Sequence, residues 1–210
     1  MPTAPAQSLQ ANYQIKVTLL GSKPPIWRRL LVSSGMNLAQ LHDVIQLAMG
    51  WYDSHLHEFT IEGERFGPPD PFGGDMGEPP PLSEKATKLS AVLGWKGAKG
   101  RYTYDFGDGW EHQIVVEKIL PPDPEVECPV CTAGKLRCPP EDCGGLHGYY
   151  NLLEAIADPG NEEHDHLLEW LGGPFDPEEF SIEETNTRLA RLRKKKTASR
   201  KAASSKGQAD

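Results

Sequence analysis

Alternating apolar and polar residues near the start of the chain predict its first β-strand. In YQIKVTLL, residues 13–20, every second side chain from Tyr13 to Leu19 is apolar. This is the pattern of a strand with one buried face. The turn GSKPP follows, and the segment IWRRLLV at 26–32 is typical of a second strand.

The next segment changes to the spacing of a helix. Asn37 is a typical N-cap residue, Gln40 occupies the capping-box position, and Gly50 is a typical residue to end a helix. The apolar face consists of Leu38, Leu41, Ile45, Ala48 and Met49. These signals predict one helix early in the chain.

Three further strands are predicted in the middle of the chain. HLHEFTIEG at 55–63 is the first, and RYTYDF and WEHQIVVEKIL flank the sequence GDG. An Asp-Gly turn between two strand patterns is a strong signal for a hairpin. Residues 66–84 between them are rich in Pro and Gly and are expected to form a loop, and a loop of that length is usually functional or disordered.

After residue 145 the pattern is helical. The segments GYYNLLEAIADP, NEEHDHLLEWLGG and SIEETNTRLARLRKKK each have an apolar stripe, and Ser181 with Glu184 forms a capping box for the last. Strands with one helix, followed by three helices, favour an α+β fold. We expect a mostly antiparallel sheet of about five strands, with one early helix and three C-terminal helices packed on one face.

Composition sets the limits of the predicted domain. Gly (21) and Pro (19) are abundant and hydrophobic residues make up 38% of the chain, so long loops and tails dilute a modest core. We expect a single domain over 12–193, with disordered tails at 1–11 and 194–210. No apolar run is long enough to cross a bilayer and the N-terminus has no apolar signal segment. These features predict a soluble, cytoplasmic protein without a membrane partner.

The charge is distributed unevenly along the chain. Nine Lys or Arg residues and one acidic residue lie between Arg188 and Asp210, a net charge of +8, so residues 1–187 carry −16. A basic tail attracts polyanions, whereas an acidic body repels phosphates. The candidate nucleic-acid contacts are Lys194, Lys195, Lys196, Arg200 and Lys201.

All four cysteines lie within the segment 128–145, which we expect to be a loop. Cys128, Cys131, Cys138 and Cys143 are candidate ligands of a zinc ion, with His147 as a substitute. Clustered cysteines in a reducing compartment bind metal more often than they form disulfides. The alternative is a set of buried thiols without a metal, because the spacing of the second pair is unusual.

Acidic and histidine side chains near the GDG turn are weak candidates for a catalytic site. Asp105, Glu111 and His112 lie near this turn, and we considered that His42, His55 and His57 converge on them. Such a set binds metal or moves protons, and the alternative is polar residues hydrogen-bonded along a sheet edge. Glu141 and Asp142 are interpreted as acids that favour the start of the next helix, and the alternative is a binding loop or carboxylates that assist a metal site.

Five motifs in order carry a resemblance to a known family. They are PPIWRRLLV, LAQLHDVIQLAMGWYDSHLHEF, YTYDFGDGWEHQIVVEKIL, CPPEDCGGLHGYYNLLEAIADP and EWLGGPFDPEEFSIEETN. The chain resembles the plasmid pRiA4b ORF-3-like family, whose members are also labelled insertion-element passenger proteins of the TnpR type. The resemblance runs from about residue 12 to 193 and implies an α+β domain associated with mobile elements, without implying a reaction.

Three functions remain open at this point. The favoured one is a non-enzymatic binding or accessory protein of mobile-element origin, contacting nucleic acid through the basic tail or a partner protein through the acidic body. The second is a metal-dependent hydrolase or nuclease that uses the His, Asp and Glu residues near the hairpin. The third is a zinc-stabilised protein-interaction domain. P-loop, H-E-x-x-H and G-x-S-x-G motifs are absent from the sequence, which argues against an enzyme of those classes.

Overall fold

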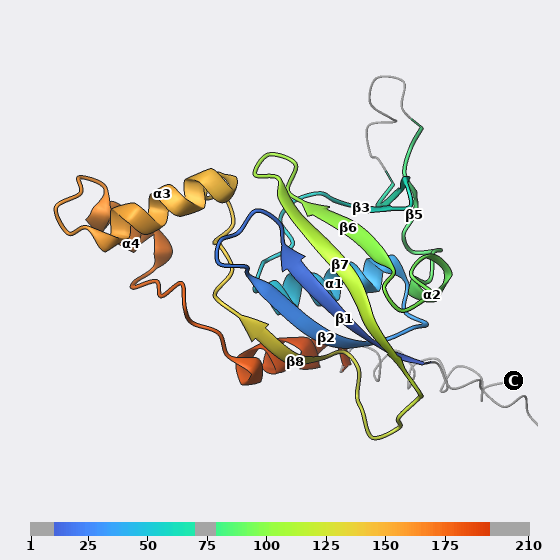
Figure 1. The fold of residues 1–210 in the computed structure, drawn as a ribbon. Coiled ribbons are helices and arrows are strands. Elements are labelled where there is room, and N and C mark those ends of the chain that lie inside the picture. The colour runs from blue at the N-terminus through green and yellow to red at the C-terminus, as the bar shows by residue number, and fades with distance from the viewer. Residues whose placement is uncertain (1–10, 70–78, 194–210) are drawn as a thin grey trace, which may run out of the picture.

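An eight-stranded sheet runs through residues 11–69 and 79–193, the parts of the chain that the computed structural model describes (Figure 1). The strand order is β5-β4-β3-β6-β7-β1-β2-β8. Neighbouring strands are antiparallel except for β4 and β5, which are parallel. The strands are β1 (Asn12–Leu19), β2 (Trp27–Ser33), β3 (His57–Ile61), β4 (Glu64–Gly67), β5 (Leu82–Ser83), β6 (Lys99–Tyr104), β7 (Trp110–Leu120) and β8 (Val130–Lys135).

The two faces of the sheet differ as the alternating pattern predicts. Side chains such as Ile15, Leu30 and Ile114 are fully buried on the inner face. On the outer face, Arg29 and Glu117 form an ion pair at 2.6 Å between β2 and β7. The period of two along each strand therefore places the core on one side of the sheet.

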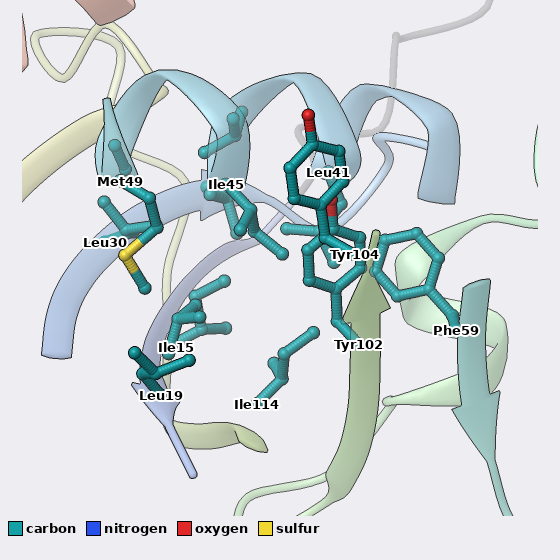
Figure 2. Packing of buried hydrophobic residues seen from close by; sticks show 14 of the residues in the cluster. Ile15, Leu19, Leu30, Leu41, Ile45, Met49, Phe59, Tyr102, Tyr104 and Ile114 are labelled. Carbon is teal, nitrogen blue, oxygen red and sulfur yellow. The ribbon is translucent and has the colours of Figure 1, made fainter. Parts of the chain in front are cut away.

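Helix α1 (Leu38–Met49) covers the inner face, and Figure 2 shows its apolar stripe above the strands. The predicted caps are confirmed. Asn37 Oδ1 accepts a hydrogen bond from Gln40 N at 2.9 Å, Gln40 Oε1 accepts one from Asn37 N, and Gly50 ends the helix with φ 95°. The segment 182–193 is helical and packs between α1 and β8, with Thr185 and Leu189 buried.

Helices α3 (Gly145–Ala157) and α4 (His164–Leu171) lie beyond one end of the sheet (Figure 1). Leu146 of α3 lies directly against Gly21, and Tyr150 OH accepts a hydrogen bond from Lys23 N at 2.7 Å. Helix α3 therefore packs on the connection between β1 and β2. A short helix, α2 (Leu89–Val92), precedes β6.

The α+β class is confirmed, but the details of the predicted fold were wrong in three respects. The sheet has eight strands instead of about five, although it is mostly antiparallel as predicted, with β4 and β5 as the parallel pair. Strand β8 occupies part of 128–145, and β5 with the end of β4 occupies part of 66–84, although both segments were predicted to be loops. Of the three predicted C-terminal helices, 182–193 packs beside α1, whereas α3 and α4 lie at the end of the sheet.

The two predicted tails fall largely outside the described ranges, and the absence of a membrane-spanning segment was also predicted. The predicted tail 194–210, with its candidate nucleic-acid contacts, and all but the last residue of the predicted tail 1–11 lie outside the described residues. Within the described ranges, no helix is both long and apolar enough to span a membrane.

Candidate functional site

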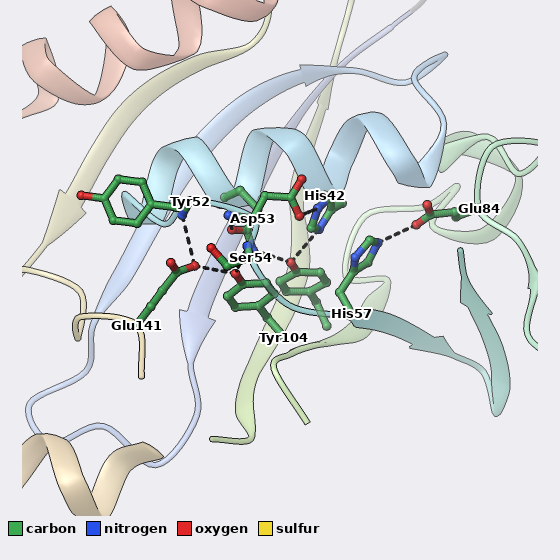
Figure 3. A network of polar contacts seen from close by, with 10 residues as sticks. His42, Tyr52, Asp53, Ser54, His57, Glu84, Tyr104 and Glu141 are labelled. Atoms are coloured by element: carbon green, nitrogen blue, oxygen red, sulfur yellow. Dashed lines mark hydrogen bonds and ion pairs between the residues drawn. The ribbon is translucent and has the colours of Figure 1, made fainter. Parts of the chain in front are cut away.

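A closed ring of hydrogen bonds joins α1 to β6 (Figure 3). His42 lies between the Tyr102 hydroxyl and the Asp53 carboxylate, with both contacts at 2.8 Å. Gln46 Nε2 donates to the same hydroxyl at 2.9 Å, and Gln46 Oε1 accepts from Asp53 N at 3.1 Å. Burial raises the pKa of Tyr102 well above its ordinary value, so its hydroxyl donates to His42 Nδ1. His42 Nε2 then donates to Asp53, and each polar group in the ring has a partner.

His57 stacks on His42 with the ring centroids 3.5 Å apart and the planes 8° from parallel. Its Nε2 contacts Glu84 Oε2 at 2.7 Å. Burial, and then the neighbouring His57, lower the pKa of His42 to about 4, so His42 is neutral at pH 7. Nitrogen and oxygen atoms of His42, Asp53 and His57 lie within 4.8 Å of one another. However, both ring nitrogens of His42 and Nε2 of His57 already have hydrogen-bond partners, so we interpret this group as structural.

A second group, which we call the His55 trio, consists of His55, Asp105 and Asp142. His55 precedes β3, Asp105 follows β6, and Asp142 lies in the loop before α3. His55 Nε2 is 3.0 Å from Asp142 Oδ1 and 3.7 Å from Asp105 Oδ2. This nitrogen is buried, yet it makes no hydrogen bond with suitable geometry to any described residue. The trio therefore differs from the His42 ring, in which each polar group is satisfied.

The backbone holds both aspartates of the trio in unusual conformations. Asp105 has φ 55° and Asp142 has φ 60°, in the left-handed region that residues other than glycine seldom adopt. Asp105 Oδ1 accepts a hydrogen bond from Gly107 N at 2.9 Å, which fixes the carboxylate in the turn between β6 and β7. Its Oδ2 is thereby directed toward His55.

Four contacts anchor the loop 137–144, which carries Asp142. Trp51 Nε1 donates to Pro139 O at 2.9 Å, and Gly144 N donates to Asp108 Oδ2 at 3.2 Å. Between them, Glu141 Oε1 accepts hydrogen bonds from the Tyr104 hydroxyl and from the backbone N of Tyr52 (Figure 3). The loop is thus positioned by residues of β6, of the turn between β6 and β7, and of the segment after α1.

A cleft of about 670 Å³ lies between the end of α1, the loop 137–144, and the segment from the end of α4 to the last helix. Its lining includes five aromatic side chains and three arginines. The aromatic residues are Trp51, Tyr52, Trp170, Phe175 and Phe180, and the arginines are Arg28, Arg137 and Arg188. Asp142 of the His55 trio also lines the cleft.

Two of these arginines cap the C-terminal end of α1. Arg28 Nε donates to Ala48 O at 3.1 Å, and Arg188 Nε donates to Leu47 O at 3.0 Å. The Arg28 guanidinium also lies over the Phe180 ring at 4.4 Å. Burial is the main cause that lowers the pKa of Arg28, and the charge of Arg188 adds to this lowering. Neither guanidinium has a carboxylate within 4.0 Å among the residues described, whereas Arg137 pairs with Glu179 at 2.7 Å.

The candidates near the hairpin have different positions. Asp105 belongs to the His55 trio, but Glu111 pairs with Arg101 at 3.0 Å, away from it. His112 is fully buried, and burial lowers its pKa to about 4. Of the histidines that we considered, His55 therefore meets Asp105, while His42 and His57 form the separate stack. Asp142, interpreted from sequence as an acid at a helix start, lies beside His55.

The structure disperses the four cysteines. Cys128 lies near Asn12, and Cys131 Sγ contacts Ala133 O at 3.4 Å. Cys138 contacts Met49 Sδ at 3.2 Å, and Cys143 is close to Asp108. Burial raises the pKa of Cys138 to about 11 and that of Cys143 to about 12, so both are thiols at pH 7.

Within 11–69 and 79–193, no group of three or more His, Cys, Asp or Glu side chains with ligand atoms within 4.8 Å of one another includes a cysteine. The substitute ligand His147 is exposed on α3. The described geometry thus offers no four-cysteine site, and zinc binding by these residues stays a prediction.

The importance of Arg28 and Arg188 was missed at the level of sequence. Alternation places Arg28 and Arg29 on opposite faces of β2, and Arg28 is the one on the inner face, where it is 3% exposed. An arginine at an inward position of a strand is the one available signal. Arg188 gives no comparable signal, because it belongs to a basic segment whose partners are distant in sequence.

Comparisons with known proteins agree with this architecture. The family model for the plasmid pRiA4b ORF-3-like protein matches residues 11–184. The uncharacterized protein y4hQ of Sinorhizobium fredii is 42% identical over 160 residues, covering 76% of this chain and 80% of that protein. The crystal structure of the protein of unknown function MM3350 from Methanosarcina mazei Go1 has a TM-score of 0.74 at 40% identity, covering 85% of this chain and 98% of that chain. The family match includes the His55 trio and Arg28, and Arg188 lies just beyond it.

Proposed function

The chain belongs to the plasmid pRiA4b ORF-3-like family, and from this premise we propose that it is a non-enzymatic binding domain. Its ligand enters the cleft beside α1. The ligand is a small molecule or terminal group with an oxyanion, a phosphate or a carboxylate, attached to an aromatic or apolar body.

The observation that carries this proposal is the pair of arginines at the cleft. Arg28 is almost completely buried and Arg188 is partly buried, and no described carboxylate pairs with either. Buried charges are normally paired, because transfer of an isolated charge out of water is costly. A bound oxyanion supplies the opposite charge, and guanidinium groups match the geometry of carboxylate and phosphate.

The end of α1 accounts for part of this arrangement. Cations are favourable at a helix C-terminus, by about 0.3–1 kcal/mol each at exposed positions and more where they are partly buried. Each Nε donates to a carbonyl of the last turn. Arg28 Nη1 also donates to Trp27 O and Lys135 O, and Arg188 Nη2 donates to Thr185 Oγ1. All of these acceptors are neutral, so among the described residues the two like charges remain without an opposite charge.

The aromatic lining favours a ligand with a flat or apolar body. Trp170 is 47% exposed although it is large and apolar, and it lines the same cleft as Phe175 and Phe180. Ligand sites are usually concave, with aromatic walls and a few charged groups that fix orientation. The described residues of the cleft contain no recognisable nucleophile and base pair, which supports binding over catalysis.

A fluorescence titration of the full chain tests the proposal, since Trp51 and Trp170 line the cleft. Phenyl phosphate and benzoate are the two probes, and the tighter of them identifies the preferred oxyanion. We expect saturable binding that the Arg188→Gln variant weakens at least about tenfold, because removal of one partner from a buried charged hydrogen bond costs about 2 kcal/mol or more.

The matched control is Arg191→Gln, an exposed position on the same helix, which should bind like the wild type. If neither probe saturates at concentrations of about 10 mM, which corresponds to less than roughly 3 kcal/mol of binding, the proposal is wrong. Equal affinity of the wild type and Arg188→Gln would also contradict it.

The other predicted roles stand as further proposals. An origin in a mobile element, which the resemblance implied, is supported by membership of a family named after a plasmid-encoded protein. Contact of the basic tail with nucleic acid rests on its charge alone. Metal-dependent hydrolysis is the second candidate function, and the His55 trio at the edge of the cleft is the observation that favours it.

A further inference from the structure

We propose that His55, Asp105 and Asp142 bind one divalent transition-metal ion at the edge of the cleft. The three ligand atoms come from three separate segments, yet they lie within 4.8 Å of one another. This site is independent of the oxyanion ligand proposed for the cleft, because it shares no residue with the arginine pair.

The separations between the ligand atoms suit a common ion. Metal bonds to imidazole nitrogen and carboxylate oxygen are about 2.1 Å long, so two ligands of one ion lie about 3.0 Å apart at a right angle and about 3.4 Å apart in a tetrahedron. The distances from His55 Nε2 to the two carboxylates are 3.0 and 3.7 Å. The His55–Asp142 separation of 3.0 Å is within this range, whereas the His55–Asp105 separation of 3.7 Å is slightly beyond it. A small rotation of the His55 ring or the Asp105 carboxylate brings all three atoms into the range of one ion.

The buried nitrogen of His55 is the strongest single indication. His55 Nε2 lies between two carboxylates but makes no hydrogen bond of suitable geometry with either, or with another described residue. A histidine that served only as an ion-pair partner would direct its N–H at an oxygen 3.0 Å away. The absence of such a bond leaves this nitrogen available to an ion that also contacts the two carboxylates.

The surroundings fix the trio before any ion binds. The Tyr104 ring packs edge-on against His55 at 5.8 Å, and the Tyr104 hydroxyl holds Glu141, the neighbour of Asp142. Gly107 N holds the other oxygen of Asp105. Contacts of this kind orient metal ligands and are part of the site.

The donor set selects the class of ion. One imidazole with two carboxylates suits Mn²⁺, Fe²⁺, Co²⁺, Ni²⁺ or Zn²⁺ better than Ca²⁺ or Mg²⁺, which prefer oxygen ligands alone. Three protein ligands leave positions open for water or for an oxygen of a ligand. Since the Asp142 side chain is 66% exposed and lines the cleft, these positions are accessible from the solvent.

Metal titration of chelator-treated full-length protein tests this proposal. We expect the protein to bind one equivalent of Mn²⁺, measured by the loss of the paramagnetic resonance signal of the free ion. It should also bind one equivalent of Co²⁺ or Zn²⁺, measured by calorimetry. Asp142→Asn should weaken binding at least about tenfold while leaving the circular dichroism spectrum unchanged. Asp165→Asn is the matched control, because the Asp165 side chain is fully exposed on α4.

The cysteines are the other candidate ligands for the added metal, so the Cys131→Ser variant is titrated in the same way. If Cys131→Ser abolishes binding and Asp142→Asn does not, or if bound Co²⁺ shows thiolate charge-transfer absorption, the ion belongs to the cysteines and the proposed site is wrong. Absence of binding for Mn²⁺, Co²⁺, Ni²⁺ and Zn²⁺ at millimolar concentration would overturn it as well. Neither outcome affects binding of phenyl phosphate or benzoate in the cleft.

Discussion

His112 on β7 is fully buried beside the rings of Trp51 and Tyr102, and neither of its ring nitrogens makes a hydrogen bond of good geometry with a described residue. The backbone of Tyr102 and Trp110 is nevertheless close enough to favour the charged ring and to offset part of the effect of burial. Burial lowers its pKa to about 4, whereas a histidine in the unfolded chain titrates near 6.5. The unfolded state therefore takes up the proton first as the pH falls. Stability conferred by neutral His112 is complete above about pH 6.5 and is lost toward pH 4. His42, with a pKa also lowered to about 4, acts in the same direction.

We predict that His112→Leu increases stability at pH 7 by about 1 kcal/mol, because a buried polar group without a partner costs about 1–3 kcal/mol. The variant should also show a smaller loss of stability between pH 6.5 and pH 4. Urea unfolding at several pH values measures both effects, and His147→Leu at an exposed position is the control. A loss of more than about 1 kcal/mol at pH 7 would indicate that His112 has a partner.

Alternation along β7 explains which candidate residues near the turn reach the trio. Trp110, His112 and Ile114 point into the core, so His112 is distant from solvent, while Glu111 points outward. The sequence shows this alternation directly and predicts that Glu111 and His112 lie on opposite sides. It does not show which of Asp105 and its neighbours meets His55, because that depends on the conformation of the turn.

At the scale of elements, the loop 137–144 depends on Tyr104 of β6. The Tyr104 hydroxyl donates to Glu141 and accepts from Ser54 N at 2.9 Å. It therefore connects β6 to the loop and to the segment after α1. Because Asp142 follows Glu141, this one hydroxyl also helps to position the His55 trio.

Tyr104→Phe should reduce stability by about 1–3 kcal/mol, since it leaves Ser54 N and Glu141 without this partner. Faster amide hydrogen exchange in 137–144 should accompany the loss. Tyr52→Phe is the matched control, because the Tyr52 side chain is 84% exposed and only its backbone N contacts Glu141. Unchanged exchange in the loop of Tyr104→Phe would mean that the other anchors suffice.

Elements with strong local signals were predicted well, and those defined by distant partners were not. The capping box at Asn37 and the hairpin of β6 and β7 are encoded within a few residues, and both are present. Strand β8 has Cys, Pro and Gly in or beside it and forms only by pairing with β2, about a hundred residues earlier. Strand β5 consists of two exposed residues beside β4. Neither has the alternating pattern from which a strand is inferred.

Across the whole molecule, charge separates the acidic body from the basic C-terminal residues. Residues 1–187 carry −16 and the rest +8. Arg193 anchors the end of the last described helix by donating to Glu127 O and Pro129 O at 3.1 Å. The cations that follow are not needed for that contact, which allows the charge and the fold to be tested separately.

Deletion of 195–210 should abolish most binding to DNA or RNA at low salt while the melting temperature barely changes. Such binding depends on release of counterions and should fall steeply with salt. Filter binding or fluorescence anisotropy at several salt concentrations measures it. If the full-length protein binds neither nucleic acid at about 50 mM salt, a concentration at which phosphate contacts are strong, the acidic body dominates and a protein partner is the better hypothesis.

The sites of this molecule are assembled from residues that are far apart in sequence. The trio joins positions 55, 105 and 142, and the arginine pair joins β2 to the last helix. Their residue types are visible in the sequence, and four of the five recognised motifs contain one of them each, whereas Arg188 lies outside all five. Their convergence follows from the order of strands in the sheet and from the anchored loop, which no local pattern encodes.

The most direct test of the central claim observes the two arginines themselves. Arg28 Nε and Arg188 Nε donate to carbonyls of α1, so their Nε–H protons are protected from exchange and visible in ¹H–¹⁵N spectra. During titration with the preferred oxyanion probe, we expect the Nε–H signals of Arg28 and Arg188 to shift in a saturable way. Those of Arg29 and Arg65, whose Nε–H groups donate to Glu117 and Glu58 outside the cleft lining, should remain in place. Equal or absent shifts for all four arginines would contradict a specific oxyanion site in the cleft.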